Sequence, residues 1–137
     1  MDGSAIDGGA ALVLRLVAGT IFVVQGWRKV VSAPDAPHGR KNLERLIARR
    51  NLPQPARLAL LVGLTELVGG AALLVGLLTR LVTVPLAVVL VVAIVGYKWE
   101  QGFLGGWDWP FSVLGIVIAL ALLGAGPLSL DALLGIP

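Results

Sequence analysis

The sequence predicts an all-α integral membrane protein: a bundle of four transmembrane helices with a short amphipathic helix in the first loop. Hydrophobic residues make up 57% of the 137 residues and charged residues only 14%, whereas soluble domains are roughly 25% charged. The mean hydropathy of +0.90 is too high for a soluble fold. The length is that of one domain, so residues 1–137 are expected to form a single membrane domain.

Four apolar stretches are long enough to cross a bilayer. A hydrocarbon core of about 30 Å requires about 20 apolar residues in a helix. The candidate spans are residues 10–31, 57–78, 81–97 and 109–124. The third span consists mostly of Val, Leu and Ala, which predicts a packing role for it.

The positive charges predict the orientation of the bundle. Eight of the eleven Lys and Arg residues fall between residues 28 and 57, Lys98 lies in the third loop, and only Arg80 lies on the other side. Loops rich in Lys and Arg stay in the cytoplasm. Loops 32–56 and 98–108 are therefore expected to be cytoplasmic and both termini extracytoplasmic. Most of the basic residues are confined to one loop and its edges, and this confinement argues against nucleic-acid binding.

The first loop contains the predicted amphipathic helix, at about residues 40–50. Leu43, Leu46 and Ile47 recur at helical spacing, with basic residues between them. This pattern favours a helix on the cytoplasmic surface of the membrane. A docking surface for a soluble partner is the alternative.

The composition excludes several kinds of chemistry. The chain has no cysteine, so it can form neither disulfides nor thiolate-ligated clusters. Its single histidine is His38 and its single methionine is Met1, so no axial haem ligand lies within a span. No metal-ligand spacing, phosphate-binding loop or nucleophile triad is present, and no metal or covalent cofactor is expected.

Two ionisable residues, Arg15 and Glu66, lie well inside the spans. A charge near the bilayer centre costs at least about 2.5–3.5 kcal/mol, and such residues usually face the bundle interior and find a partner. Arg15 shares one helical face with Gly19, Phe22, Gly26 and Lys29. Gly63, Glu66 and Gly70 form a matching face on the second span. Two interpretations of Glu66 are about equally supported. In the first, Glu66 forms an internal ion pair with Arg15 or Lys29. In the second, its carboxylate anchors a ligand or handles protons.

The aromatic residues are placed asymmetrically. All four tryptophans and Tyr97 fall at the end that carries the first and third loops. An interfacial aromatic belt is the favoured interpretation, and a pocket for a flat ring is the alternative. The candidate ligand-binding residues are Arg15, Gln25, Lys29, Glu66, Tyr97, Trp107 and Asp108.

The order and spacing of these residues resemble the DoxX family of small bacterial membrane proteins. The resemblance rests on a series of short motifs along nearly the whole chain: Arg15, Gly19, Phe22, Gly26 and Lys29, then Leu52-Pro53, Glu66, Gly69-Gly70, Gly76-Leu77, Thr79-Arg80, Gly105-Gly106-Trp107-Asp108, Gly124, Gly126 and Ser129-Leu130-Asp131. No single motif is specific, but their order is.

The resemblance implies a four-helix fold in the bacterial inner membrane and an association with sulfur or thiol redox systems. One branch is similar to the small membrane subunit of thiosulfate:quinone oxidoreductase. Another is linked with complexes that pair the membrane protein with a sulfurtransferase and a superoxide dismutase. This chain departs from the family where Gln25 replaces a frequent histidine. Because it lacks cysteine, any thiol chemistry would belong to a partner protein.

Two functions compete. The first is a membrane subunit of a redox complex, linked to sulfur or thiol metabolism or to oxidative stress, that binds quinone or a similar lipid-soluble molecule near Glu66. The alternative is a non-catalytic anchor or scaffold that recruits a soluble partner through the basic loop, residues 32–57. A transport function is less favoured, because four short spans would have to oligomerise to form a pathway. The expected partners are the bilayer and either other subunits or a second copy.

Overall fold

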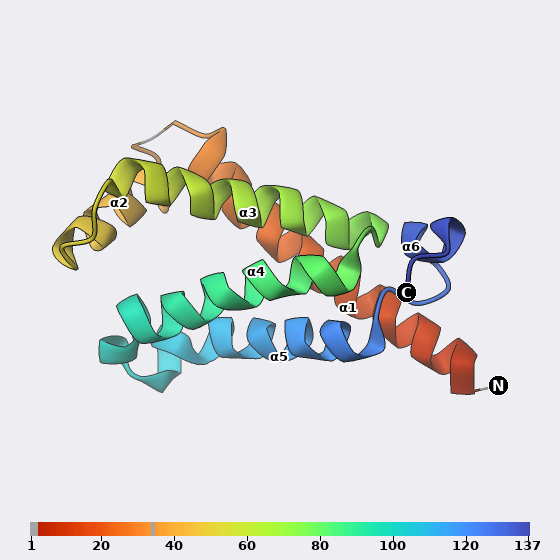
Figure 1. Cartoon of the computed structure of the whole chain (residues 1–137). Helices are drawn as coiled ribbons and strands as arrows, with labels where there is room; N and C mark the ends of the chain where they lie inside the picture. Colours follow the sequence, from red (N-terminus) through yellow and green to blue (C-terminus); the bar gives the residue numbers. More distant parts are fainter. Residues whose placement is uncertain (1–2, 34) are drawn as a thin grey trace.

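The computed structural model describes residues 3–33 and 35–137. Within these ranges the chain is helical without strands, and four helices are long and apolar enough to cross a membrane. These are α1 (Gly3–Val30), α3 (Pro55–Val75), α4 (Thr79–Ala93) and α5 (Asp108–Leu123) (Figure 1). Helical turns extend the last two to spans of Thr79–Gln101 and Phe103–Leu123. The predicted fold class is confirmed.

The first two spans differ from their expected limits, and α3 begins two residues earlier and ends three residues earlier than the expected 57–78. Helix α1 begins at Gly3, before the apolar run that starts near residue 10. Helix α3 ends at Val75 because Gly76 adopts the left-handed conformation, with φ of 71°. A glycine in this conformation is a common helix terminator. The connection to α4 is therefore a turn over residues 76–78.

Helices α1 and α3 pack backbone to backbone through the predicted glycine faces. A Cβ atom at Gly26 would lie 2.3 Å from the Leu67 nitrogen and 2.7 Å from the Gly63 oxygen. A Cβ atom at Gly19 would lie 2.9 Å from the Gly70 oxygen. Small residues permit such close approach between membrane helices. The predicted contact between the two faces is confirmed.

The apolar core lies where α1 and α3 meet α4 and α5. Its largest buried side chains come from all four helices and include Phe22, Leu73, Leu86 and Leu120. Helix α4 packs most extensively on α5, while α1 packs on α3. The bundle is therefore built from two helix pairs that share one core.

The connection between α4 and α5 is a helical hairpin rather than an open loop. It contains a π-helical turn at Ile94–Lys98 and a 3-10 turn at Trp99–Gln101, followed by the segment Phe103–Trp107, which is kinked at Leu104 and Gly105. Aromatic rings hold it together: Trp99 stacks on Trp107 with centroids 5.4 Å apart, and Phe103 meets Trp107 edge to face at 4.6 Å.

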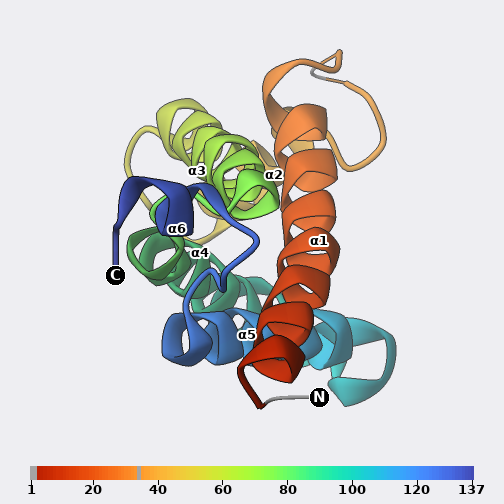
Figure 2. The same ribbon diagram turned by 90° about the vertical axis from the view of Figure 1, so that its right-hand side faces the viewer.

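At the opposite end, the chain after α5 folds back over the bundle (Figure 2). It ends in the short helix α6 (Leu130–Leu134), whose Ala132 nitrogen donates to the Ser129 hydroxyl. Ser129 is therefore the N-cap of α6. The Asp131 carboxylate accepts hydrogen bonds from the Leu78 and Thr79 nitrogens, at 2.6 and 2.9 Å. This carboxylate therefore ties α6 to the start of α4.

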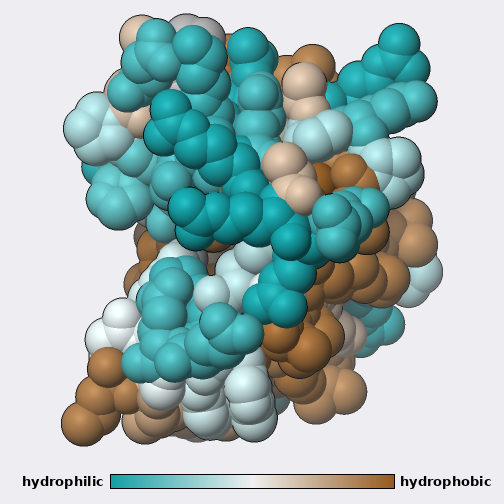
Figure 3. Space-filling view, turned by 90° about the vertical axis from the view of Figure 1, so that its left-hand side faces the viewer, coloured by the Kyte–Doolittle hydropathy of each residue, from teal (hydrophilic) through white to brown (hydrophobic). Residues whose placement is uncertain are grey.

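Both described ends of the chain lie at this end of the bundle, and the amphipathic helix α2 (Arg40–Arg49) lies at the other. The predicted helix in the first loop is present at the expected position. Polar residues cover much of the end that carries α2 (Figure 3). We call this end the loop end.

Candidate ligand site between α3 and α4

Lys29 of α1 and Glu66 of α3 form an ion pair inside the bundle. The Lys29 ammonium donates to one oxygen of the Glu66 carboxylate, and the two side chains are 13% and 8% exposed. The register comes from glycine packing, because a Cβ atom at Gly63 would lie 2.7 Å from the Lys29 Cβ. The close approach of α1 and α3 therefore brings Lys29 to the face that carries Glu66.

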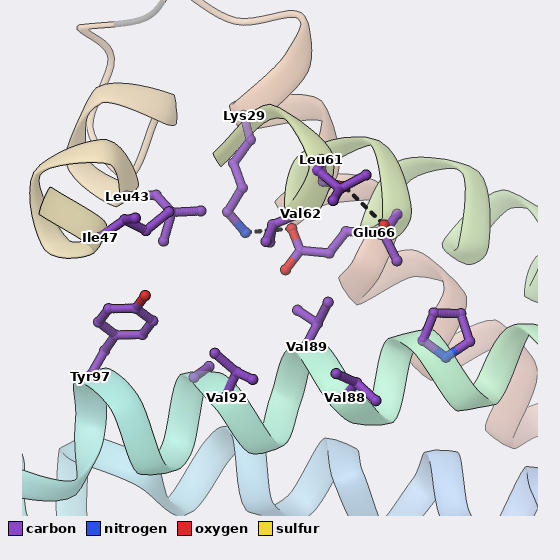
Figure 4. A pocket seen from close by; sticks show the side chains of 13 residues that line it. Lys29, Leu43, Ile47, Leu61, Val62, Glu66, Val88, Val89, Val92 and Tyr97 are labelled. Carbon is purple, nitrogen blue, oxygen red and sulfur yellow. Dashed lines mark hydrogen bonds and ion pairs between the residues drawn. The ribbon is translucent and has the colours of Figure 1, made fainter. Parts of the chain in front are cut away.

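Glu66 faces a cavity of about 440 Å³ between α3 and α4. Its carboxylate and the Lys29 ammonium lie in the gap between the two helices, with Tyr97 across from them (Figure 4). The second carboxylate oxygen points toward α4 and away from Lys29 (Figure 4). Most of the remaining wall is aliphatic and includes Val88 and Val92.

The cavity is open toward the side of the bundle that would face lipid. Leu61 on α3 and Val88 and Val92 on α4 line it and are between 49% and 60% exposed. In a membrane these exposed aliphatic side chains would contact acyl chains. A molecule dissolved in the bilayer could therefore reach Glu66 without crossing the loop end.

Helix α2 closes the cavity at the loop end. Leu43 and Ile47 point from α2 into it, and Ile47 is only 3% exposed (Figure 4). The sequence predicts that the apolar side of α2 lies on the membrane surface, whereas in the structure this side packs against α3 and over the cavity. The bundle offers the apolar side of α2 a surface on which to bury its side chains, and this burial is favourable even where no lipid covers them.

A second cavity, of about 320 Å³, meets the same ion pair from the other side. Lys29, Glu66 and Tyr97 border both cavities. The second cavity is much more polar, with Gln25, Arg28, His38, Asn42, Lys98 and Trp109 among its lining residues. Lys98 also lies over the Trp109 ring, 5.5 Å from its centroid.

Four of the seven residues proposed from the sequence border these cavities: Gln25, Lys29, Glu66 and Tyr97. Trp107 belongs to the helical hairpin between α4 and α5, where it stacks on Trp99. Asp108 starts α5, where its carboxylate accepts hydrogen bonds from the Gly105 and Trp109 nitrogens.

Arg15 lies at the opposite end and does not pair with Glu66. Its guanidinium is buried and donates to four backbone oxygens, those of Leu73, Leu74, Ala125 and Leu128, at 2.7–3.1 Å. Two of these carbonyls belong to the last turn of α3, where backbone donors are scarce; the Leu73 oxygen also accepts from the Gly76 nitrogen. Arg15 thus joins α3 to the returning C-terminal segment.

The sequence pattern did not single out several residues of the cavity wall. Span three was expected to serve packing only, yet one of its faces borders the first cavity through Pro85, Val88, Val89, Val92, Ala93 and Tyr97. Their spacing of three and four residues leads to Tyr97 on the same helical face. This alignment is the sequence signal that could have identified one face of span three as a cavity wall. Nothing comparable indicated that α2 would fold over Glu66.

Comparison with known proteins agrees with this architecture. Residues 10–99 match the DoxX family. A protein of Bacillus subtilis (strain 168) named "Putative oxidoreductase CatD" is 32% identical over 120 residues, which cover 88% of this chain and 83% of that protein. An uncharacterized membrane protein of Mycobacterium tuberculosis (strain H37Rv) is 34% identical over 100 residues, which cover 70% of this chain and 58% of that protein.

No solved structure gives a significant match to the chain. The family match includes both α1 and α3, with the Lys29–Glu66 pair, and ends within the hairpin after α4. It therefore spans the helices that border the first cavity. The chain is a multi-pass membrane protein and belongs to the DoxX family.

Proposed function

We propose that this protein is the membrane subunit of an oxidoreductase system and binds a quinone or a similar lipid-soluble ring compound in the cavity between α3 and α4. The observation that carries the proposal is the Lys29–Glu66 pair, which lies in an otherwise aliphatic cavity open toward lipid. The oxidoreductase name of the Bacillus relative supports a redox role.

The chemistry of the pair suits both redox forms of such a ring. An oxidised quinone has two carbonyl oxygens, which accept hydrogen bonds from an ammonium or a phenol. Lys29 and Tyr97 offer these donors. The reduced form has two hydroxyl groups, which donate to a carboxylate such as Glu66. The cavity of about 440 Å³ is within the usual range for small-molecule sites.

The test uses calorimetry to measure direct binding of a short-chain quinone to the purified protein in nanodiscs. Glu66→Gln removes one charged partner. A hydrogen bond to a charged group contributes about 1.5–3 kcal/mol, so the affinity should fall at least about tenfold. Glu44→Gln is the matched control, because Glu44 pairs with Arg40 on the outside of α2. Equal affinity of both variants would contradict the proposal.

A second pair of variants tests the position of the ligand. Val88→Trp places a large ring at the lipid-facing opening of the cavity and should abolish quinone binding. Val84→Trp is the control, since Val84 is similarly exposed on α4, at 62% against 56%, but does not border the cavity. Binding that survives Val88→Trp would place the ligand elsewhere.

A scaffold function is the second candidate, favoured by the exposed side of α2. Because the apolar residues of this helix face the bundle, Lys41, Arg45 and Arg49 are exposed at the loop end. We infer that this basic surface could hold an acidic soluble partner, and that the loop end faces the cytoplasm. Replacing the three residues by Gln should abolish co-purification of the partner. Unchanged recovery would exclude this surface as its binding site.

A further inference from the structure

Two neighbouring cavities meet at the Lys29–Glu66 pair, and the lining of the second is the more polar of the two. The first is aliphatic and opens between α3 and α4, whereas the second opens at the loop end. Arg28, His38 and Asn42 border the second cavity and are exposed. Glu66 itself is only 6% exposed. Its contact with water therefore depends on the second cavity.

The second cavity is large and polar enough to hold water. Its volume of about 320 Å³ corresponds to roughly ten water molecules at about 30 Å³ each, and a cavity retains water when polar partners line it. Gln25 and Asn42 supply amide groups, and Trp109 supplies an indole NH. Such a cavity can maintain a chain of water from the loop end to the carboxylate.

The groups that surround Glu66 come from several elements. Helix α1 contributes Lys29 and Arg28, and the loop before α2 contributes His38. The π-helical turn contributes Tyr97 and Lys98. The residues of α2 and α4 that border either cavity are uncharged. Among the described residues that line the two cavities, Glu66 is thus the only carboxylate.

We propose that the second cavity is the aqueous entrance to the Lys29–Glu66 pair and delivers protons from the loop end to Glu66. The hydrocarbon side cannot do so, because protons require water or polar groups. Intramembrane carboxylates commonly belong to proton relays, and an imidazole such as His38 at the mouth is a common proton shuttle. Transfer of that proton to a bound ring would rest on the proposed function, whereas proton access to Glu66 would not.

Carbodiimides test the entrance without any quinone. They activate a carboxyl group once it has taken a proton, which the Lys29 ammonium in contact with Glu66 can supply without any proton from outside the pair. The amine left on Lys29 then displaces the urea by-product and forms an amide. Because Lys29 contacts Glu66, the product is a cross-link between α1 and α3 with loss of one water, which peptide mass spectrometry detects. The full-length protein in nanodiscs is treated with either a water-soluble carbodiimide or dicyclohexylcarbodiimide, which partitions into lipid.

Two blocking variants separate the entrances. Asn42→Trp fills the second cavity from α2, and Val88→Trp fills the first from α4. The water-soluble reagent should cross-link the wild type and Val88→Trp, and should lose this reaction in Asn42→Trp. Dicyclohexylcarbodiimide should show the reverse. Its reaction with Asn42→Trp also shows that this variant is folded.

The proposal fails if the water-soluble reagent does not cross-link the wild type, or if Val88→Trp rather than Asn42→Trp stops it. Gln25→Phe blocks the same cavity from α1 and must reproduce the loss seen with Asn42→Trp; an unchanged reaction would also overturn the proposal. If quinone does not bind but these results hold, only the proposed ligand is wrong.

Discussion

The Lys29–Glu66 pair allows a quantitative test that separates stability from ligand binding. The perturbation is a double-mutant cycle of Lys29→Met, Glu66→Leu and the combined variant. At an effective dielectric constant of about 20, two charges about 4 Å apart attract by about 4 kcal/mol. Because both side chains are less than 15% exposed, removing one of them leaves the other charge buried without its partner. Each single variant should therefore lose about 3–5 kcal/mol of unfolding free energy.

The combined variant should recover most of that loss. Replacing a buried ion pair by apolar residues of similar volume is often neutral or stabilising, because neither charge then has to be desolvated. Unfolding free energies are measured in mixed micelles by circular dichroism. The pair Arg40 and Glu44, replaced in the same way, is the control. It is partly exposed, and such i,i+4 pairs contribute only about 0.3–0.5 kcal/mol.

The same variants decide whether the pair is functional. The combined variant should fold like the wild type and yet not bind the short-chain quinone, since both charged anchors are gone and only Tyr97 remains. The argument about buried charge would be refuted if the combined variant lost the sum of the two single-variant losses in unfolding free energy. Such additivity, within about 0.5 kcal/mol, is what independent sites show. Quinone binding by a stable combined variant would show that the pair serves only the fold.

Three further predictions concern the helix contact and the far end of the bundle. Arg15→Met should cost at least about 3 kcal/mol, because the carbonyls of Leu74, Ala125 and Leu128 lose their donor; thermal unfolding followed by tryptophan fluorescence measures it, and Arg57→Met on the surface should change little. Gly26→Val should prevent stable folding, because its Cβ atom would overlap the backbone of Leu67; recovery of monodisperse protein in detergent checks this. Ser129→Ala should remove the cap of α6 and cost about 1 kcal/mol, and cleavage of the segment after α5 by a non-specific endoprotease should become faster, whereas an unchanged rate would argue against the cap.

The four spans and the facing glycines were predictable because they depend on local regularities. Span length follows from bilayer thickness, and a helical face follows from 3.6 residues per turn. Gly19, Gly26 and Gly63 were therefore predictable as parts of matching faces on the first two spans, and the structure places all three in the α1–α3 contact. Buried charge was equally visible, since Arg15 and Glu66 interrupt apolar runs.

The partners of those charges were not predictable, because they depend on how distant segments fold back. Both Arg15 and Lys29 lie on the face of α1 that meets α3, so spacing alone left either as the partner of Glu66. The return of the C-terminal segment supplies carbonyls to Arg15, and this leaves Lys29 to pair with Glu66. The sequence by itself determined that charges lie inside the bundle. Only the tertiary structure decided which of them borders a cavity, because a cavity is the space that separate helices fail to fill.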